Sequence, residues 1–306
     1  MKINGETIKK IRIEMNMSRE EMAAQLYISV RQIARIESGE INRLFEMIDL
    51  PADEESIAMN KVTHVSLLKE IEFSNVTFSY GDNPVLKDVS LTIKAGQRVA
   101  LVGKSGSGKS TILALLLGLF SPQNGNICIN GYSPQNLDRT TWLSYFAYVP
   151  QDYPLLDMTI RENIELGRNE IAFDENALSD AINTAMVSQI IEELPEGLDS
   201  TVGEGGNRLS GGQRQRVNIA RALYRDAPIV LLDEANSAID HTNVNHLEQG
   251  LANSFMNKTS ITVTHRLENM SVYDIIFMID NGTIIEQGTH DELLQNNGAY
   301  AKMVSG

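Results

Sequence analysis

The hydrophobic pattern after residue 68 switches between the periods of strands and helices. Residues 69–80 alternate apolar and polar positions, as a strand with one buried face does. Residues 99–102 (V-A-L-V), 229–233 and 260–263 are short apolar runs typical of buried strands, and residues 112–117 predict a helix. Asn281-Gly282, between residues 275–280 and 283–286, predicts a hairpin turn, and residues 289–302 predict short helices. The alternation indicates the α/β class.

The first fifty residues have a purely helical pattern. Ile8, Ile11 and Met15 share one face of a first short helix. Capping boxes at Ser18 and Ser29 predict the starts of a second and a third. We expect a small helical domain at residues 1–50, a polar and acidic linker at 51–67, and a large α/β domain at 68–306.

Composition limits the classes of protein that this chain can be. It has 306 residues, of which 42% are hydrophobic, and one cysteine, which we expect to be buried in a reduced, cytosolic protein. We see no signal-peptide pattern and no apolar run near the ~20 residues that cross a bilayer. Residues 1–48 carry eight basic and seven acidic residues, whereas the rest carries 18 and 33. The large part is therefore a poor binder of nucleic-acid phosphates.

A glycine-rich loop joins the first buried strand to the helix that follows. Its sequence, G-K-S-G-S-G-K-S-T at residues 103–111, fits the G-x-x-x-x-G-K-S pattern in the strand–loop–helix context of a phosphate-binding loop. Glycines let backbone N–H groups turn towards a phosphate, and the helix N-terminus favours an anion. Lys109 would contact the β- and γ-phosphates and Ser110 a Mg²⁺ ion. The alternative is a glycine-rich turn that caps a core helix.

Five further motifs follow in order. They are Y-V-P-Q-D at 148–152, L-S-G-G-Q at 209–213, I-V-L-L-D-E at 229–234, S-A-I-D at 237–240 and T-H-R at 264–266. Together with the loop, they resemble the ATPase domain of ABC transporters over about residues 68–304. The resemblance implies a P-loop NTPase fold: a RecA-like core, an antiparallel β-subdomain and a helical subdomain that carries L-S-G-G-Q.

The same resemblance assigns roles to individual residues, with ATP and Mg²⁺ as cofactors. Asp233 would hold Mg²⁺ with Ser110, Glu234 would be the general base, and His265 would contact the γ-phosphate and hold Glu234 in place. The predicted catalytic residues are Lys109, Gln151, Glu234 and His265, and the predicted metal ligands are Ser110, Gln151 and Asp233. The predicted nucleotide contacts are Tyr80, Gly103, Ser105, Gly106, Gly108, Lys109, Ser110, Thr111, Ser210, Gly211, Gly212, Gln213 and Asp240.

The ABC resemblance also implies partners. L-S-G-G-Q of one subunit would close on ATP held by Lys109 of another, giving a head-to-tail dimer, homomeric or heteromeric, around two ATP. T-V-G-E-G-G at 201–206 resembles the loop with which exporter-type ATPases touch their membrane domain. Exporters usually carry that domain in the same chain, so we expect a separate membrane protein as partner and a cytoplasmic position at the inner face of the cell membrane. Asn236 and Trp142-Leu143 depart from the family pattern.

Residues 5–37 resemble the helix-turn-helix of phage-repressor-like proteins. By that resemblance residues 29–37 would be the recognition helix, with Arg31, Gln32 and Arg35 outward. Tyr27 and Arg19 depart from the family pattern. One interpretation is that residues 18–37 bind DNA. The alternatives are that the segment is a helical module for packing or dimerisation, or a relic of gene fusion.

Three functions remain open from the sequence. The leading hypothesis is the ATPase subunit of an exporter-type ABC system. The rival is a soluble, ATP-switched DNA-binding regulator that uses the helix-turn-helix, and the third is an exporter remnant with ATPase activity but no transport. The transported molecule is not predicted, because exporters bind it in the membrane domain.

Overall fold

The computed structural model describes residues 67–151, 155–166, 174–234, 250, 254–255 and 258–305. The helix-turn-helix-like segment, the linker up to residue 66, Asp240 and Asn236 lie outside these ranges, so the predictions made for them stay predictions.

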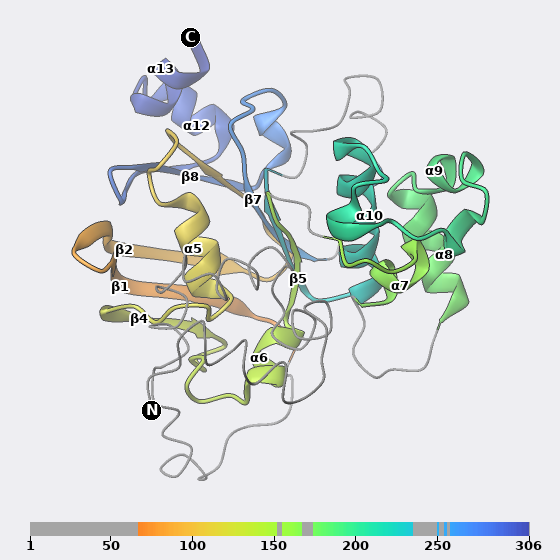
Figure 1. The fold of residues 1–306 in the computed structure, drawn as a ribbon. Coiled ribbons are helices and arrows are strands. Elements are labelled where there is room, and N and C mark those ends of the chain that lie inside the picture. Colours follow the sequence, from red (N-terminus) through yellow and green to blue (C-terminus); the bar gives the residue numbers. More distant parts are fainter. Residues whose placement is uncertain are drawn as a thin grey trace.

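Two β-sheets form the frame of the described part (Figure 1). The smaller sheet is antiparallel, in the order β2-β1-β4, with β1 at Glu70–Tyr80, β2 at Asn83–Lys94 and β4 at Asn124–Ile129. The larger has the order β5-β6-β7-β3-β8-β9. Its strands are β3 (Arg98–Val102), β5 (Phe146–Val149), β6 (Ile229–Asp233), β7 (Thr259–Val263), β8 (Ile275–Asp280) and β9 (Thr283–Gly288). The pair β8–β9 is antiparallel, and the other neighbouring pairs in this sheet are parallel.

Helices lie on both faces of the larger sheet. They are α5 (Lys109–Leu116), α6 (Arg139–Ser144), α7 (Ile160–Glu165), α8 (Glu175–Thr184), α9 (Ser188–Glu192), α10 (Gly211–Arg225), α12 (His290–Gln295) and α13 (Ala299–Ser305). Short 3₁₀ turns occur at Gly197–Asp199, Glu204–Gly206 and Met270–Val272. In Figure 1 the smaller sheet and α5 lie on one side of β5, and α7–α10 lie on the other.

Alternating side chains divide the core of the large sheet into layers. Leu101 and Leu231 point to the face that packs against α5 and the smaller sheet. Val230 and Leu232 point the opposite way and pack with α7–α10, and Val102 packs with α12 and α13. Because side chains in a strand alternate between faces, runs that are apolar throughout are required for strands buried on both sides. The strands and the hairpin predicted from the apolar runs are confirmed.

The prediction that the lone cysteine is buried is wrong. Cys128 is half-buried in β4, and its Sγ lies 3.1 Å from Asn126 Nδ2. Its neighbours Ile127 and Ile129 are buried, so the period of two residues turns Cys128 to the other face.

The single tryptophan, Trp142 in α6, lies beneath the end of α5. Its side chain is 2% exposed, and its indole N–H donates to the Leu116 carbonyl at 3.0 Å. The indole thus caps one of the last carbonyls of the helix that begins at the glycine-rich loop. Among the helices that the structure describes, none has the length and apolar character to cross a membrane.

Candidate active site

The glycine-rich loop adopts a conformation that requires its glycines. Gly103, Gly106 and Gly108 have φ values of 146°, 77° and 106°, all in the region that other residues rarely adopt. A Cβ on Gly103 would overlap the Ile279 carbonyl oxygen, and one on Gly108 would lie 2.6 Å from Leu86 Cδ2. The loop is therefore packed closely on β8 and β2 at its two ends, while Gly106 has open space around it.

Lys109 is the first residue of α5 and is 4% exposed. Its Nζ donates to the carbonyls of Gly103 at 2.9 Å and Lys104 at 2.8 Å, and lies 3.5 Å from Ser107 Oγ. Burial lowers the pKa of Lys109. These acceptors are neutral oxygens, so an anionic phosphate in the loop would be a stronger partner for the ammonium group.

A buried carboxylate faces the start of α5. Asp233 is the last residue of β6 and is 4% exposed, and Ser110 Oγ donates to its Oδ1 at 3.2 Å. Burial raises the pKa of Asp233, and the hydrogen bond from Ser110 opposes that shift. The site thus lies at the carboxyl ends of parallel strands, where open α/β sheets bind their ligands.

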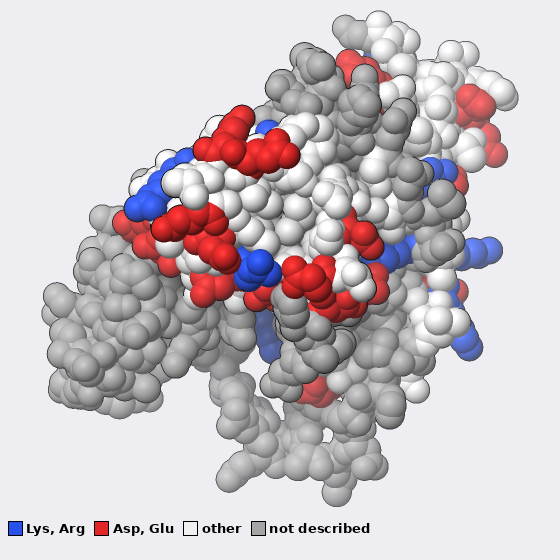
Figure 2. All heavy atoms as spheres, turned by 90° about the vertical axis from the view of Figure 1, so that its right-hand side faces the viewer, with Lys and Arg blue, Asp and Glu red and all other residues white. Residues whose placement is uncertain are grey.

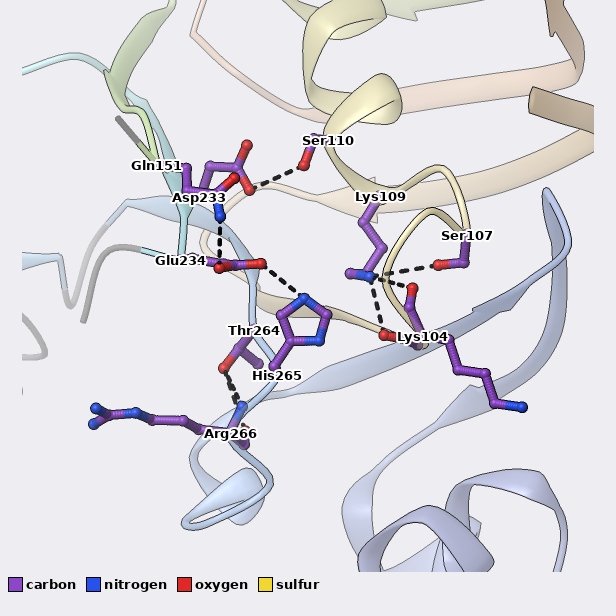
Figure 3. A network of polar contacts seen from close by, with 11 residues as sticks. Lys104, Ser107, Lys109, Ser110, Gln151, Asp233, Glu234, Thr264, His265 and Arg266 are labelled. Atoms are coloured by element: carbon purple, nitrogen blue, oxygen red, sulfur yellow. Dashed lines mark hydrogen bonds and ion pairs between the residues drawn. The ribbon is translucent and has the colours of Figure 1, made fainter. Parts of the chain in front are cut away.

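Glu234 connects two side chains that are far from it in sequence (Figure 3). Gln151 Nε2 donates to Glu234 Oε2 at 3.0 Å, and His265 Nε2 lies 2.7 Å from Glu234 Oε1. Glu234 has a φ of 51°, an uncommon value for a residue with a side chain, and its N–H donates to the Val263 carbonyl at 3.0 Å. The carboxylate is therefore held from both sides directly after β6.

A short turn after β7 positions His265. The N–H of Arg266 donates to Thr264 Oγ1 at 3.0 Å, and the N–H of Thr264 donates to the Leu101 carbonyl at 3.3 Å. The histidine between them is tied to β3, the strand that leads into the glycine-rich loop.

The side chains that meet here fit a nucleoside triphosphate with Mg²⁺. The Ser110 hydroxyl and the Asp233 carboxylate offer hard oxygen ligands, the kind that Mg²⁺ prefers. Within the described residues no group of three or more His, Cys, Asp and Glu is placed to hold a metal by itself. Mg²⁺ commonly takes one or two protein oxygens together with substrate phosphates, so two ligands beside a phosphate loop are enough.

One of the predicted nucleotide contacts is an exposed aromatic ring. Tyr80 ends β1 and is 42% exposed. Its ring makes edge-to-face contacts with Phe78 at 4.8 Å and with Phe120 at 5.2 Å between ring centroids. The two supporting rings come from different segments, so the orientation of Tyr80 depends on both β1 and the chain after α5.

A second helix N-terminus is built from residues 209–213. Ser210 is the N-cap of α10, its Oγ accepts from the N–H of Gln213 at 3.2 Å, and Gln213 Oε1 accepts from the N–H of Ser210 at 2.8 Å. This reciprocal capping fixes where the helix starts and leaves the first N–H groups, at Gly211 and Gly212, without acceptors inside the helix. Because α5 and α10 lie on opposite faces of the larger sheet, the two helix N-termini are separate features of one chain.

Comparison with known proteins decides the family. A family model described as "ABC transporter" matches residues 86–237, which include the glycine-rich loop, residues 209–213 and the acid pair. Residues 86–237 belong to the ABC transporter family. Within this ABC cassette, L-S-G-G-Q is the signature sequence, and a helix-turn-helix model matches residues 8–49, in agreement with the pattern of the N-terminal segment.

Relatives of the ABC cassette are named as a flippase, a multidrug transporter and, for a solved structure, an exporter. The chain is 39% identical over 288 residues to an ATP-dependent lipid A-core flippase of Saccharophagus degradans, covering 92% of this chain and 48% of the flippase. It is 44% identical over 239 residues to the ABC multidrug transporter atrD of Emericella nidulans, covering 77% of this chain and 18% of that protein. A bacterial Atm1-family ABC exporter with ATP bound has a TM-score of 0.78 at 36% identity, over 90% of this chain and 47% of that one. The chain spans about half the length of the flippase and of the Atm1-family exporter, and less of atrD.

The structure brings most of the predicted site residues together. Ser110 pairs with Asp233, and Gln151 and His265 both contact Glu234, the residue after β6 (Figure 3). Lys109 lies nearby in the same view and is bonded to its own loop. The signature residues lie at the start of α10, and Asp240 is outside the described residues. The catalytic and binding roles assigned to these residues remain predictions.

Other side chains were missed by the sequence analysis. Asn163, 0% exposed in α7, accepts from Arg221 Nη2 of α10 at 2.9 Å, and Arg221 Nε donates to the Asn163 carbonyl at 2.7 Å. The Asn163 amide also donates to and accepts from the backbone of Leu156, at 3.0 and 2.9 Å. Burial lowers the pKa of Arg221 to about 10. Asn163 thus joins the backbone of Leu156 to α10, the helix that begins at the signature. No short motif in the sequence predicts this contact.

Proposed function

We propose that this chain is the ATP-binding and ATP-hydrolysing subunit of an exporter-type ABC system, and that it drives a separate membrane domain. The observation that carries the proposal is the network in which Glu234 is held by Gln151 and His265 beside the Ser110–Asp233 pair. Transfer of a phosphoryl group to water needs positioned charges rather than covalent chemistry by the protein, and this network supplies them.

The side chains divide the tasks of the proposed reaction among them. Lys109 turns its ammonium group from the loop carbonyls to the β- and γ-phosphates. Ser110 and Asp233 would hold Mg²⁺, whose charge would neutralise the phosphates. Glu234 accepts the proton of the attacking water, while His265 keeps the Glu234 carboxylate in place and contacts the γ-phosphate. Tyr80 offers an exposed aromatic face to the adenine ring.

A head-to-tail dimer would complete the site. The N-terminus of α10 attracts an anion through its dipole and its unpaired N–H groups, as the start of α5 does. In the proposed dimer, Ser210, Gly211 and Gly212 of one subunit face the ATP held by Lys109 of the other. Two ATP molecules are then enclosed. Because the bound ATP favours the closed state over the open one, its hydrolysis removes contacts that hold the interface closed, and the interface opens.

The loop before the signature supports contact with a membrane partner. Glu204 is exposed at the start of a 3₁₀ turn at Glu204–Gly206, and Arg208 Nη1 fixes the base of the loop by donating to Thr201 Oγ1 at 2.6 Å. The named relatives of the cassette are transporters, which favours this proposal over a soluble DNA-binding regulator.

The surface charge also favours a transporter subunit over a DNA-binding regulator. Figure 2 shows acidic side chains, with some basic ones between them, on the face on the α7–α10 side of the molecule. Exposed acids of this layer include Glu175, Asp180, Glu192, Glu193 and Glu196. Such a face repels the phosphates of nucleic acid. A gel-shift screen with and without ATP separates the two functions, because sequence-selective, ATP-dependent DNA binding would favour the regulator.

Replacing Glu234 by Gln tests the proposal directly. We expect ATP hydrolysis to fall about 100-fold or more, because a positioned general base contributes at least that factor. ATP binding should persist, and ATP should trap a dimer on size-exclusion chromatography. Glu192→Gln, at an exposed position in α9 outside the network, is the matched control and should keep its turnover. Unchanged hydrolysis in Glu234→Gln would remove Glu234 from the role of base.

A further inference from the structure

The turn between β8 and β9 touches the phosphate loop although about 175 residues separate them in sequence. The N–H of Gly282 donates to the Ser107 carbonyl at 3.2 Å, and the Gly282 carbonyl accepts from the N–H of Lys87 in β2 at 2.8 Å. Gly282 is buried, whereas Asn281 beside it is exposed. One residue therefore joins the loop, the hairpin and the smaller sheet through its own backbone.

The hydrogen bond to Ser107 sets the direction of a peptide group in the loop. In a trans peptide the carbonyl and the following N–H point in opposite directions, and the described residues contain no cis peptide. The Ser107 carbonyl points to the hairpin, so the N–H of Gly108 points away from it. Gly108 is the N-cap of α5, at the place where a phosphate would meet the helix.

No side chain fits at Gly282. A Cβ there would overlap the Val85 carbonyl oxygen and would lie 2.9 Å from the Val85 carbonyl carbon and 3.3 Å from Leu86 Cα. All three atoms belong to the backbone of β2, so no side-chain rotation relieves the contact. Leu86 in turn packs on Gly108. A shift of β2 would therefore displace the loop through this contact as well as through the hydrogen bond between Gly282 and Ser107.

We infer that Gly282 is a positioning residue for phosphate binding: the β8–β9 turn holds the peptide between Ser107 and Gly108 in the orientation that receives the β- and γ-phosphates. The inference rests on the nucleotide binding proposed above. Gly282 touches no nucleotide, and it acts through Ser107 and β2.

Gly282→Ala, compared with Gly131→Ala, tests this role. Both glycines have nearly the same conformation, with φ values of 81° and 82°, but a Cβ on Gly131 meets nothing within 4 Å. The two variants therefore share the cost of a left-handed alanine, and only Gly282→Ala adds the clash. We expect the Kd for ATP and for tripolyphosphate to rise about tenfold or more in Gly282→Ala, the equivalent of one charge-assisted hydrogen bond. Gly131→Ala should bind both as the wild type does.

The affinity for adenosine separates positioning from general damage. Adenosine has no phosphates, so its affinity should be equal in the wild type and in Gly282→Ala. A folded Gly282→Ala variant that binds ATP and tripolyphosphate like the wild type would overturn the inference, as would an equal loss for adenosine. If the wild type itself binds neither ATP nor tripolyphosphate, the proposed function fails instead.

Hydrogen exchange on the unmodified chain keeps the inference testable if Gly282→Ala does not fold. Coupling between two sites is reciprocal, so a ligand of the loop must stabilise the turn if the turn stabilises the loop. We expect tripolyphosphate to slow exchange in peptides that contain Gly282 and to leave the β1–β2 turn at Gly81 unchanged. Equal exchange at Gly282 with and without bound tripolyphosphate would contradict the coupling.

Discussion

Asp233 and Lys109 are opposite charges that the fold buries close to each other. Burial is the main cause of both pKa shifts: it raises the pKa of Asp233 and lowers that of Lys109. In both cases the neutral form is favoured relative to the same group in water. The charged site is therefore a cost to the nucleotide-free protein, and a bound nucleotide with Mg²⁺ would offset it.

We predict that Asp233→Asn stabilises the nucleotide-free protein at neutral pH. The folded-state pKa of Asp233 is raised, so its ionised form costs stability above that pKa, and the cost disappears as falling pH protonates the carboxyl group. The variant should have the higher melting temperature at pH 7, and the gap should narrow on acidification. Mg²⁺–ATP should raise the melting temperature of the wild type more than that of Asp233→Asn, because the variant lacks one of the two proposed Mg²⁺ ligands.

Asp180→Asn, which neutralises an exposed acid on α8, is the control for that measurement. Its melting temperature should equal that of the wild type, both without nucleotide and with Mg²⁺–ATP. A lower melting temperature for Asp233→Asn at pH 7 would mean that the ionised carboxylate stabilises the fold.

Single residues could be predicted where a motif fixes their place in sequence. Lys109, Ser110 and the acid pair belong to short motifs beside buried strands, and parallel strands end at one edge of the sheet, so their convergence follows from pattern alone. Phe120 behind Tyr80 and the Gly282 contact could not be predicted, because they depend on which distant segments the fold brings together.

Elements were predicted well where their pattern is strong. The buried strands and the β8–β9 hairpin lie within one or two residues of the expected ranges. The small helices α7 and α9, with six and five residues, were not predicted. Helices this short have little intrinsic stability, and packing on their neighbours holds them in place.

The Asn163–Arg221 bridge leads to a prediction about elements. Asn163→Ala removes the partner of a buried guanidinium group and of the Leu156 backbone, and unsatisfied buried groups cost about 1–3 kcal/mol each. We expect unfolding free energy to fall by at least about 2 kcal/mol in a denaturant titration. Asn183→Ala in α8 is the control, because Asn183 is exposed and accepts from the Ser188 hydroxyl at 2.8 Å. An equal loss of unfolding free energy in the two variants would show that the Asn163–Arg221 bridge contributes no more than an exposed hydrogen bond.

At the scale of the molecule, one chain carries two helices, α5 and α10, on opposite faces of its sheet, and each begins at a predicted anion-binding motif. The start of α5 follows the phosphate loop, and the start of α10 carries the signature. A single nucleotide between them requires a second copy or a similar cassette. That requirement makes the proposed dimer testable without a structure of the complex.

We predict that two inactive variants restore activity when mixed. Lys109→Ala disables the phosphate loop and Ser210→Arg blocks the signature, so each homodimer lacks both sites. A mixed dimer has one intact site and one doubly defective site, and a random mixture should recover about a quarter of the wild-type ATPase rate if the sites act independently. No recovery in a mixture with proven mixed dimers would mean that each chain builds its own site.

The place of Trp142 gives the protein a natural optical probe. The indole is the only one in the chain and donates its hydrogen to the last residue of α5, the helix that starts at the phosphate loop. Tryptophan fluorescence of the chain thus comes from a single side chain at the end of α5. A spectral change on adding a ligand can be assigned to that point without attaching a dye.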